Sequence, residues 1–255
     1  MVTGASRGIG RAVALGLARE GVDVAIVSRH REAIEEAAAA IAAETGRRVW
    51  PFVADLADGP ATEAFMTAAV EALGGLDILV NNGARVSGSE PEDFEDVTEA
   101  LIRRDFEEKV LGYLRCARLA VPWMKRGGFG RIVNISGYAA RTAGPISAGI
   151  RNAAVVHLTR SLAFAVGRDN ITVNAVYPSV TVTETLTERL AARAAREGRS
   201  VDAVLAEEVA RHALGRLVRA EEIADVVVFL ASPRASGITG EVIPVAGGAE
   251  RAVRY

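Results

Sequence analysis

The sequence is poor in several features, and each absence limits the possible functions. Of 255 residues only Cys116 is a cysteine, which excludes an intrachain disulfide and makes a reduced, cytoplasmic location the expectation. No apolar run approaches the roughly 18 to 20 residues that span a bilayer, and Met1 leads directly into a glycine-rich loop instead of a signal peptide. Lysine occurs only at Lys109 and Lys125, whereas arginine is abundant, which we attribute to coding bias.

An excess of charge of one sign is also lacking. The formal net charge is −2, with 30 basic and 32 acidic residues, so nothing favours binding to nucleic acid or to an anionic membrane. No spacing of His, Cys and Asp predicts a metal site, and no Ser-His-Asp order or nucleophile elbow is found. With 50% hydrophobic and 24% charged residues, the composition is that of a globular protein.

Short β-branched runs alternate with alanine-rich helical patterns along the chain. The expected strands are Val24–Val27, Arg48–Val53, Ile78–Val80, Arg131–Ile135, Thr172–Tyr177 and Glu241–Val245. The expected helices are Gly10–Glu20, Arg31–Thr45, Pro60–Leu73, Glu99–Arg126, Ser147–Val166 and Ala220–Ala231. Several strands are continuously apolar, which is typical of strands covered on both faces. The alternation predicts an α/β fold, a Rossmann-type doubly wound parallel sheet in three α/β/α layers.

We expect one dinucleotide-binding domain over residues 1–255. A first strand should precede Thr3, where only Met1 and Val2 are available, so this strand is very short or the true start lies upstream. Residues 185–213 depart from the alternation, because they are polar and helical in period. They predict a helical lid over about residues 184–215 at the ligand-binding edge of the sheet; the alternative is a solvated helical hairpin with no ligand role.

The segment Thr3–Gly10 reads TGASRGIG and lies between the first strand and the first helix. Its glycines permit a tight turn, a close approach of the backbone to a pyrophosphate, and close packing of the helix on the sheet. The helix that follows directs its N-terminal amides and positive dipole at the phosphates. We expect a dinucleotide to bind to Gly4, Ser6, Arg7, Gly8, Ile9 and Gly10.

The end of the second strand predicts which dinucleotide binds. An acidic residue there would bind the ribose hydroxyls and favour NAD. Ser28 and Arg29 occupy this position instead, and Arg29 and Arg7 can donate charge-assisted hydrogen bonds to a 2′-phosphate. The cofactor is therefore expected to be NADP(H); the alternative is that both arginines are only surface residues.

These motifs resemble those of the short-chain dehydrogenase/reductase family along essentially the whole chain. Thr3–Gly10 is similar to its TGxxxGxG loop, residues 81–84 (NNGA) to its NNAG turn, and residues 215–248 to its C-terminal segment. The resemblance implies a small-molecule substrate and a homotetramer or homodimer. It also implies further cofactor contacts, at Asp55, Leu56, Asn82, Gly83, Pro178, Thr181 and Thr183.

The resemblance fails at the catalytic positions. The family uses an Asn, a Ser, and a Tyr and Lys four residues apart on one helix. Alignment on the neighbouring motifs puts Ala148 at the Tyr position, Asn152 at the Lys position, Lys109 at the Asn position and Gly137 at the Ser position. Alanine has no ionisable group, so the usual proton transfer cannot run on these residues.

Several residues are candidate replacements. Tyr138 is a chemically suitable acid, and one hypothesis pairs it with Lys109 as a relocated Tyr/Lys pair. The alternative is that Tyr138 packs against its loop and Lys109 reaches to solvent. Ser136 is a candidate substrate contact, although strand alternation favours the opposite face. Asn152 is expected to bind the nicotinamide ribose.

Weaker candidates are charged or imidazole side chains near the same edge. Arg151 and Arg85 are candidates for contact with an anionic substrate. His30 follows the expected 2′-phosphate site, His157 is expected to pack within a helix, and His212 lies in the expected lid.

Three functions remain open. The first is an NADP(H)-dependent oxidoreductase that transfers a hydride to or from a carbonyl, imine or activated alkene, with a non-standard proton donor such as Tyr138, water or the substrate. The second is a redox-silent lyase, isomerase or cyclase on the same scaffold. The third is a non-catalytic NADP(H)-binding protein.

Overall fold

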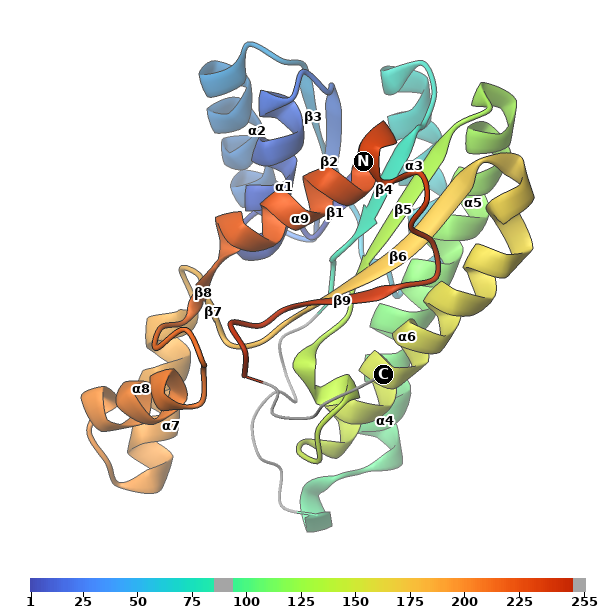
Figure 1. The fold of residues 1–255 in the computed structure, drawn as a ribbon. Coiled ribbons are helices and arrows are strands. Elements are labelled where there is room, and N and C mark those ends of the chain that lie inside the picture. The colour runs from blue at the N-terminus through green and yellow to red at the C-terminus, as the bar shows by residue number, and fades with distance from the viewer. Residues whose placement is uncertain (85–93, 250–255) are drawn as a thin grey trace.

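The computed structural model describes residues 1–84 and 94–249, and its centre is a seven-stranded parallel sheet. The strand order is β3-β2-β1-β4-β5-β6-β9, so the chain reverses direction across the sheet between β1 and β4 (Figure 1). The strands are β1 (Val2–Thr3), β2 (Val24–Ser28), β3 (Val49–Val53), β4 (Ile78–Asn81), β5 (Gly130–Ile135), β6 (Ile171–Pro178) and β9 (Val242–Val245). The carboxyl ends of β1, β2, β4, β5 and β6 meet at one edge, where ligands bind in such sheets.

Helices cover both faces of the sheet, which confirms the expected three layers. One face carries α1 (Gly8–Arg19), α2 (Arg31–Thr45) and α9 (Ala220–Ala231), and the other carries α3 (Gly59–Leu73), α5 (Gly112–Gly127) and α6 (Ile146–Val166). Each face has its own buried core. Leu17 and Ile34 belong to the first core, and Met66 and Met124 belong to the second. Burial of both faces is the reason why the strands are continuously apolar.

The chain is helical throughout the expected range Glu99–Arg126, but the middle of the helix is not α-helical. The chain forms α4 (Glu99–Asp105), then a π-helical segment (Phe106–Leu111), then α5. A π turn is wider than an α turn and is found frequently at functional sites. This π segment buries the charged side chains of Glu108 and Lys109.

The polar segment after β6 forms a separate pair of helices. α7 (Leu186–Glu197) and α8 (Val201–Ala210) lie to one side of the main body in Figure 1 and share a small core that includes Leu190 and Val204. A two-stranded parallel sheet joins the base of this excursion, with β7 (Thr181–Val182) beside β8 (Val218–Arg219). Sequence periodicity missed β7 and β8 because each has only two residues.

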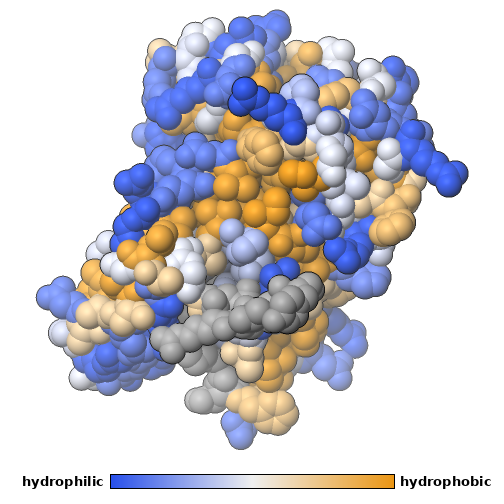
Figure 2. Space-filling view, viewed as in Figure 1, coloured by the Kyte–Doolittle hydropathy of each residue, from blue (hydrophilic) through white to orange (hydrophobic). Residues whose placement is uncertain are grey.

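The remaining elements are single 3-10 turns, at Phe94–Asp96, Tyr138–Ala140, Gly167–Asp169 and Pro233–Ala235. None of the helices in the described ranges is both long and apolar enough to cross a membrane. Figure 2 shows that apolar residues gather over the middle of the side on which α9 and β9 lie, between more polar margins.

Candidate functional site

The glycine loop between β1 and α1 is closely packed against its surroundings. Gly4 and Gly8 have positive φ angles of 66° and 58°, which favour glycine because a side chain would strain the backbone. A Cβ at Gly10 would lie 2.3 Å from the Gly4 carbonyl oxygen. Ser6 is half-buried, Arg7 is exposed at the N-cap of α1, and Ile9 packs against the core. The loop therefore depends on backbone shape.

Two side chains fix this loop to the end of β4. Asn82 Nδ2 donates hydrogen bonds to the carbonyl oxygens of Thr3 (3.1 Å) and Gly4 (3.0 Å). Thr3 Oγ1 in turn accepts from the amides of Asn82 and Gly83, at 2.9 Å each. Asn82 and Gly83 thus shape the glycine loop, and the sequence pattern gave no sign of Thr3 as their partner.

The N-terminus of α1 holds a negatively charged oxygen. The amide of Gly8 donates to Glu184 Oε2 at 2.9 Å, and the side chain of Arg7 does not cap the helix. Thr183 lies against Gly8, since a Cβ there would be 3.4 Å from Thr183 Cγ2. Both residues line a pocket of about 280 Å³ between α1 and the segment after β7. This helix end is electrostatically suited to an anion, and no sequence motif pointed to Glu184.

The end of β2 carries no carboxylate. Ser28 is buried, and its hydroxyl donates to the carbonyl oxygen of His30 at 3.2 Å. Arg29 and Arg7 are exposed, and within the described parts of the chain neither forms an ion pair. Both guanidinium groups therefore remain available to a ligand at this edge.

The ends of β3 and β6 place the other expected cofactor contacts. Asp55 caps a turn by accepting from the amide of Ala57 at 3.0 Å, and Leu56 is buried. At the end of β6, Pro178 is half-buried and Thr181 is buried, with its hydroxyl bonded to the Ser179 carbonyl oxygen at 2.9 Å.

His212 joins the end of α8 to the end of β6. Its Nε2 lies 2.8 Å from Ser179 Oγ, and its Nδ1 lies 2.7 Å from the carbonyl oxygen of Glu208. Ser179 Oγ also lies 3.2 Å from the Ala246 carbonyl oxygen, at the end of β9. The imidazole therefore connects the excursion to the main sheet.

At the end of β5, Lys109, Ser136 and Asn152 form one buried cluster. Lys109 Nζ donates to the carbonyl oxygen of Ser136 at 3.1 Å and to Asn152 Oδ1 at 2.8 Å. Ser136 Oγ donates to the backbone carbonyl of Asn152 at 3.1 Å, so the serine faces α6 and not the opposite side of the sheet. Burial lowers the pKa of Lys109 to about 7, and the nearby charge of Arg151 acts in the same direction. The expectation that Lys109 reaches solvent was wrong, since it is 7% exposed.

A buried ion pair lies next to this cluster. Asp105 accepts a short hydrogen bond from Arg151, and Ser147 Oγ donates to the same carboxylate at 2.6 Å. All three side chains are at most 5% exposed. Arg151 is therefore engaged by Asp105 within the protein, which argues against its role as a contact for an anionic substrate.

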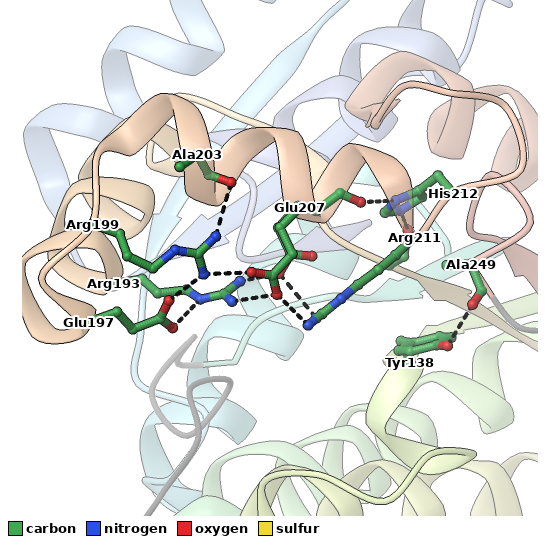
Figure 3. Close-up of polar contacts among 11 residues, drawn as sticks. Tyr138, Arg193, Glu197, Arg199, Ala203, Glu207, Arg211, His212 and Ala249 are labelled. Atoms are coloured by element: carbon green, nitrogen blue, oxygen red, sulfur yellow. Dashed lines mark hydrogen bonds and ion pairs between the residues drawn. The ribbon is translucent and has the colours of Figure 1, made fainter.

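The structure does not join Tyr138 to Lys109. The Tyr138 hydroxyl donates to the carbonyl oxygen of Ala249 at 2.8 Å, beyond the end of β9 (Figure 3). Lys109 is bonded to other groups, so the relocated Tyr/Lys pair is absent from the described contacts. The distance in sequence, 111 residues, explains why the Ala249 contact could not be predicted.

The structure also bears on His157 and Arg85, the weaker candidates for the site. His157 is exposed on α6, 3.3 Å from Ser161 Oγ, and so does not pack within the helix as expected. Arg85 lies outside the described residues. Within residues 1–84 and 94–249 there is no group of three His, Cys, Asp or Glu side chains that could hold a metal ion.

Comparison with known proteins identifies the family. A family model described as enoyl-(acyl carrier protein) reductase matches residues 4–250. The short-chain reductase protein NovJ of Streptomyces niveus is 36% identical over 97% of this chain and 92% of its own length. The chain belongs to the short-chain dehydrogenase/reductase family.

Solved structures of this family have the same fold. L-Sorbose reductase from Gluconobacter frateurii, complexed with NADPH and L-sorbose, matches with a TM-score of 0.92 and 29% identity over 99% of this chain and 96% of its own. An NAD⁺-bound xylitol dehydrogenase matches with a TM-score of 0.89 and 28% identity over 97% and 96%. The neighbours thus include proteins solved with each of the two nicotinamide dinucleotides.

In this short-chain dehydrogenase/reductase, the structure also places two residues that the sequence motifs align with the family's tyrosine and serine. Ala148, at the position aligned with the family's tyrosine, is buried on α6. A Cβ at Gly137, aligned with the family's serine, would lie 2.7 Å from Asn152 Nδ2. The asparagine amide therefore lies directly against the backbone of Gly137, and a serine side chain would not fit there without moving it.

Proposed function

We propose that the protein is an NADP(H)-dependent oxidoreductase that transfers a hydride between the nicotinamide and a carbonyl, imine or activated alkene of a small molecule. The observation that carries this proposal is the α1 N-terminus, where the Gly8 amide already binds a carboxylate oxygen, next to Arg7 and near the β2 end with Arg29. An anion-binding helix end beside two exposed guanidinium groups suits a pyrophosphate and a 2′-phosphate.

The residues at the sheet edge fit the cofactor. Gly4, Ser6, Gly8, Ile9 and Gly10 would hold the pyrophosphate, because no side chain at the glycines blocks its approach. Ser28 and Arg29, with Arg7, would hold the 2′-phosphate, and Asp55, Leu56, Asn82 and Gly83 would border the adenosine. Asn152, Pro178, Thr181 and Thr183 would face the nicotinamide end. The bound cofactor would supply a hydride at its nicotinamide C4.

The α7–α8 excursion would serve as the substrate lid over about residues 184–215. It is internally tied by ion pairs, in which Arg193 contacts Glu197, Glu207 and Glu208 (Figure 3). Hydrogen bonds from Arg199 and Arg193 lower the pKa of Glu207 to about 2, so this carboxylate stays charged at neutral pH. We expect the two helices to move as one body. The assembly of several copies implied by the family stays a prediction.

The test is a nicotinamide assay on the purified protein. NADPH is mixed with a panel of ketones, enones and imines, and the nicotinamide absorbance is followed. Loss of absorbance with reduction of a panel member supports the proposal. Titration calorimetry with NADPH and NADH reports binding independently, with NADPH expected to bind at least tenfold more tightly.

A second function is favoured by one observation. Ala148 leaves the usual proton donor absent, which is what a redox-silent enzyme or a non-catalytic NADP(H)-binding protein on this scaffold would show. Conversion of a substrate without a change in absorbance would support the redox-silent enzyme. Tight NADPH binding with no conversion of any panel member would support the binding protein.

A further inference from the structure

In the motif alignment, Lys109 falls at the position of the family's asparagine and Asn152 at that of its lysine. The lysine extends from the π segment and the asparagine from α6, and their side chains meet with Nζ 2.8 Å from Oδ1. The lysine amino group thus meets the asparagine amide from the π segment, whereas in the family the lysine extends from the helix that corresponds to α6. Its second anchor, the Ser136 carbonyl, lies one residue beyond β5, at the edge where ligands bind.

Lys109 Nζ makes two hydrogen bonds, and both the neutral amine and the ammonium can donate them. A neutral amine has two N–H donors and one lone pair, whereas an ammonium has three donors. Ser136 and Asn152 accept from two N–H groups, and these are the hydrogen bonds of Nζ within the described parts of the chain. The Tyr113 ring also lies near Nζ, with its centroid 5.9 Å away. The third position can therefore gain or lose a proton while both anchors stay in place.

The charged and titratable groups around Nζ keep both protonation states within reach. Arg151 on α6 opposes the positive charge, and Asp105 at the end of α4 supports it. Tyr113 on α5 donates its hydroxyl to the Ile135 carbonyl at 3.2 Å, and burial raises its pKa, so it stays neutral. Glu108 is the neighbouring buried carboxylate of the π segment. Burial is the largest cause of the lowered pKa of Lys109, about 7, which is the range that suits acid–base catalysis near neutral pH.

We propose that Lys109 is the catalytic residue that exchanges the proton with the substrate, in place of the absent tyrosine. The inference rests on the proposed hydride transfer. In the reductive direction, one N–H bond of the ammonium breaks and the substrate's carbonyl oxygen takes the proton. The carbonyl carbon takes the hydride from the reduced nicotinamide, the C=O π bond is lost, and the alcohol forms. The neutral amine then takes a proton from water. Asn152 acts as a positioning residue, because it fixes the direction of Nζ.

Activity measurements test the role of Lys109 directly. Lys109→Met is expected to lower kcat by about 10²- to 10⁴-fold, the usual contribution of a positioned acid, with the NADPH Kd within threefold of wild type. Lys109→Arg keeps the charge but cannot release a proton, so it should lose activity as well. The matched control is Lys125→Met, which removes the other lysine, half-exposed and ion-paired with Asp169 at 2.7 Å.

The pH dependence has a definite sign. Reduction needs the ammonium, so the wild-type kcat should fall as pH rises through about 7. Oxidation of the alcohol needs the amine, so its kcat should rise over the same range. Lys109→Met with wild-type kcat and an unchanged pH profile would overturn the proposal, as would full activity of Lys109→Arg. So would a Tyr138→Phe variant that loses all turnover while Lys109→Met keeps it.

A second measurement does not depend on turnover. Because Lys109 and Lys125 are the only lysines, NMR of protein labelled with ¹³C-lysine should show just two side-chain titrations, assigned with Lys125→Met. We expect the Lys109 signal to titrate near pH 7, and a titration above pH 9 would overturn the proposal. A titration near 7 in a protein that binds NADPH but reduces no substrate would instead refute the proposed oxidoreductase function, and with it the proton transfer.

Discussion

The two ends of the ligand-binding edge differ in what they are built from. At the β1–α1 end, the proposed site consists of amides, carbonyls and glycines, and neighbouring atoms occupy the Cβ positions of Gly4 and Gly10. At the β5 end, it consists of side chains: Lys109, Ser136 and Asn152 joined in one buried cluster.

This difference follows from the physical basis of each site. Recognition of a phosphate by backbone amides depends on chain geometry, so few residue types are allowed and the motif survives. Proton transfer depends on a functional group at a point in space, and that point can be reached from more than one helix. At the end of β5, Lys109 of the π segment and Asn152 of α6 meet at one such point.

The largest expected effect is a loss of NADPH affinity when a side chain is added in the glycine loop between β1 and α1. Gly10→Ala places a Cβ 2.3 Å from the Gly4 carbonyl oxygen and 2.5 Å from Asn82 Nδ2, so the loop must shift. We expect NADPH affinity to fall by at least about 100-fold, measured by titration calorimetry. The control is Gly167→Ala, where nothing lies within 4 Å of the added Cβ. Unchanged affinity in Gly10→Ala would show that the loop is not the phosphate site.

The next largest effect concerns the free energy of unfolding and its dependence on the protonation of Lys109. The native pKa of Lys109, about 7, lies below the value of 10.5 for a free lysine. The free-energy cost of burying the charged lysine is therefore greatest below pH 7, and this cost falls as pH rises toward 10.5. Lys109→Met should gain stability relative to wild type by roughly 3 kcal/mol more at pH 6 than at pH 9. Urea unfolding at both pH values measures the difference, and a difference independent of pH would contradict the buried titration.

A smaller effect is expected at the end of β2. Arg29→Asp removes a donor for the 2′-phosphate and adds the carboxylate that favours the ribose of NAD. The ratio of NADPH to NADH affinity should fall by about tenfold or more, which corresponds to roughly 1.4 kcal/mol. Arg168→Asp makes the same change of charge at an exposed position beyond α6 and serves as the control. An unaltered ratio would mean that Arg29 is only a surface residue.

The smallest effect concerns Glu184, whose carboxylate is bound at the N-terminus of α1. Glu184→Gln removes the charge that the Gly8 amide binds at 2.9 Å, and with it a competitor for the cofactor phosphates. A charge at a helix end is worth roughly 0.3 to 1 kcal/mol, so NADPH affinity should rise about two- to fivefold. Glu188→Gln, on the exposed side of α7, is the control. A loss of affinity would show that Glu184 supports cofactor binding instead of opposing it.

The sequence alone was sufficient for the fold and for the glycine loop. Apolar strands and helical periods predicted the parallel sheet, and the boundaries of α2 and α9 agree with the structure. Periodicity could not predict the π segment, because a single wide turn barely alters the helical pattern. It also could not show that Tyr138 bonds to Ala249, or that Arg151 pairs with Asp105, since such contacts depend on packing between distant segments.

The pairing of β7 with β8 has a consequence for how this fold can change in evolution. Because the two strands lie side by side, the chain leaves and re-enters the main body at one point. The intervening stretch can lengthen, shorten or be replaced without altering the register of the seven-stranded sheet, since loops that start and end together are thermodynamically tolerant of insertions. With the proposed lid role, substrate range can therefore diverge independently of cofactor choice within one architecture.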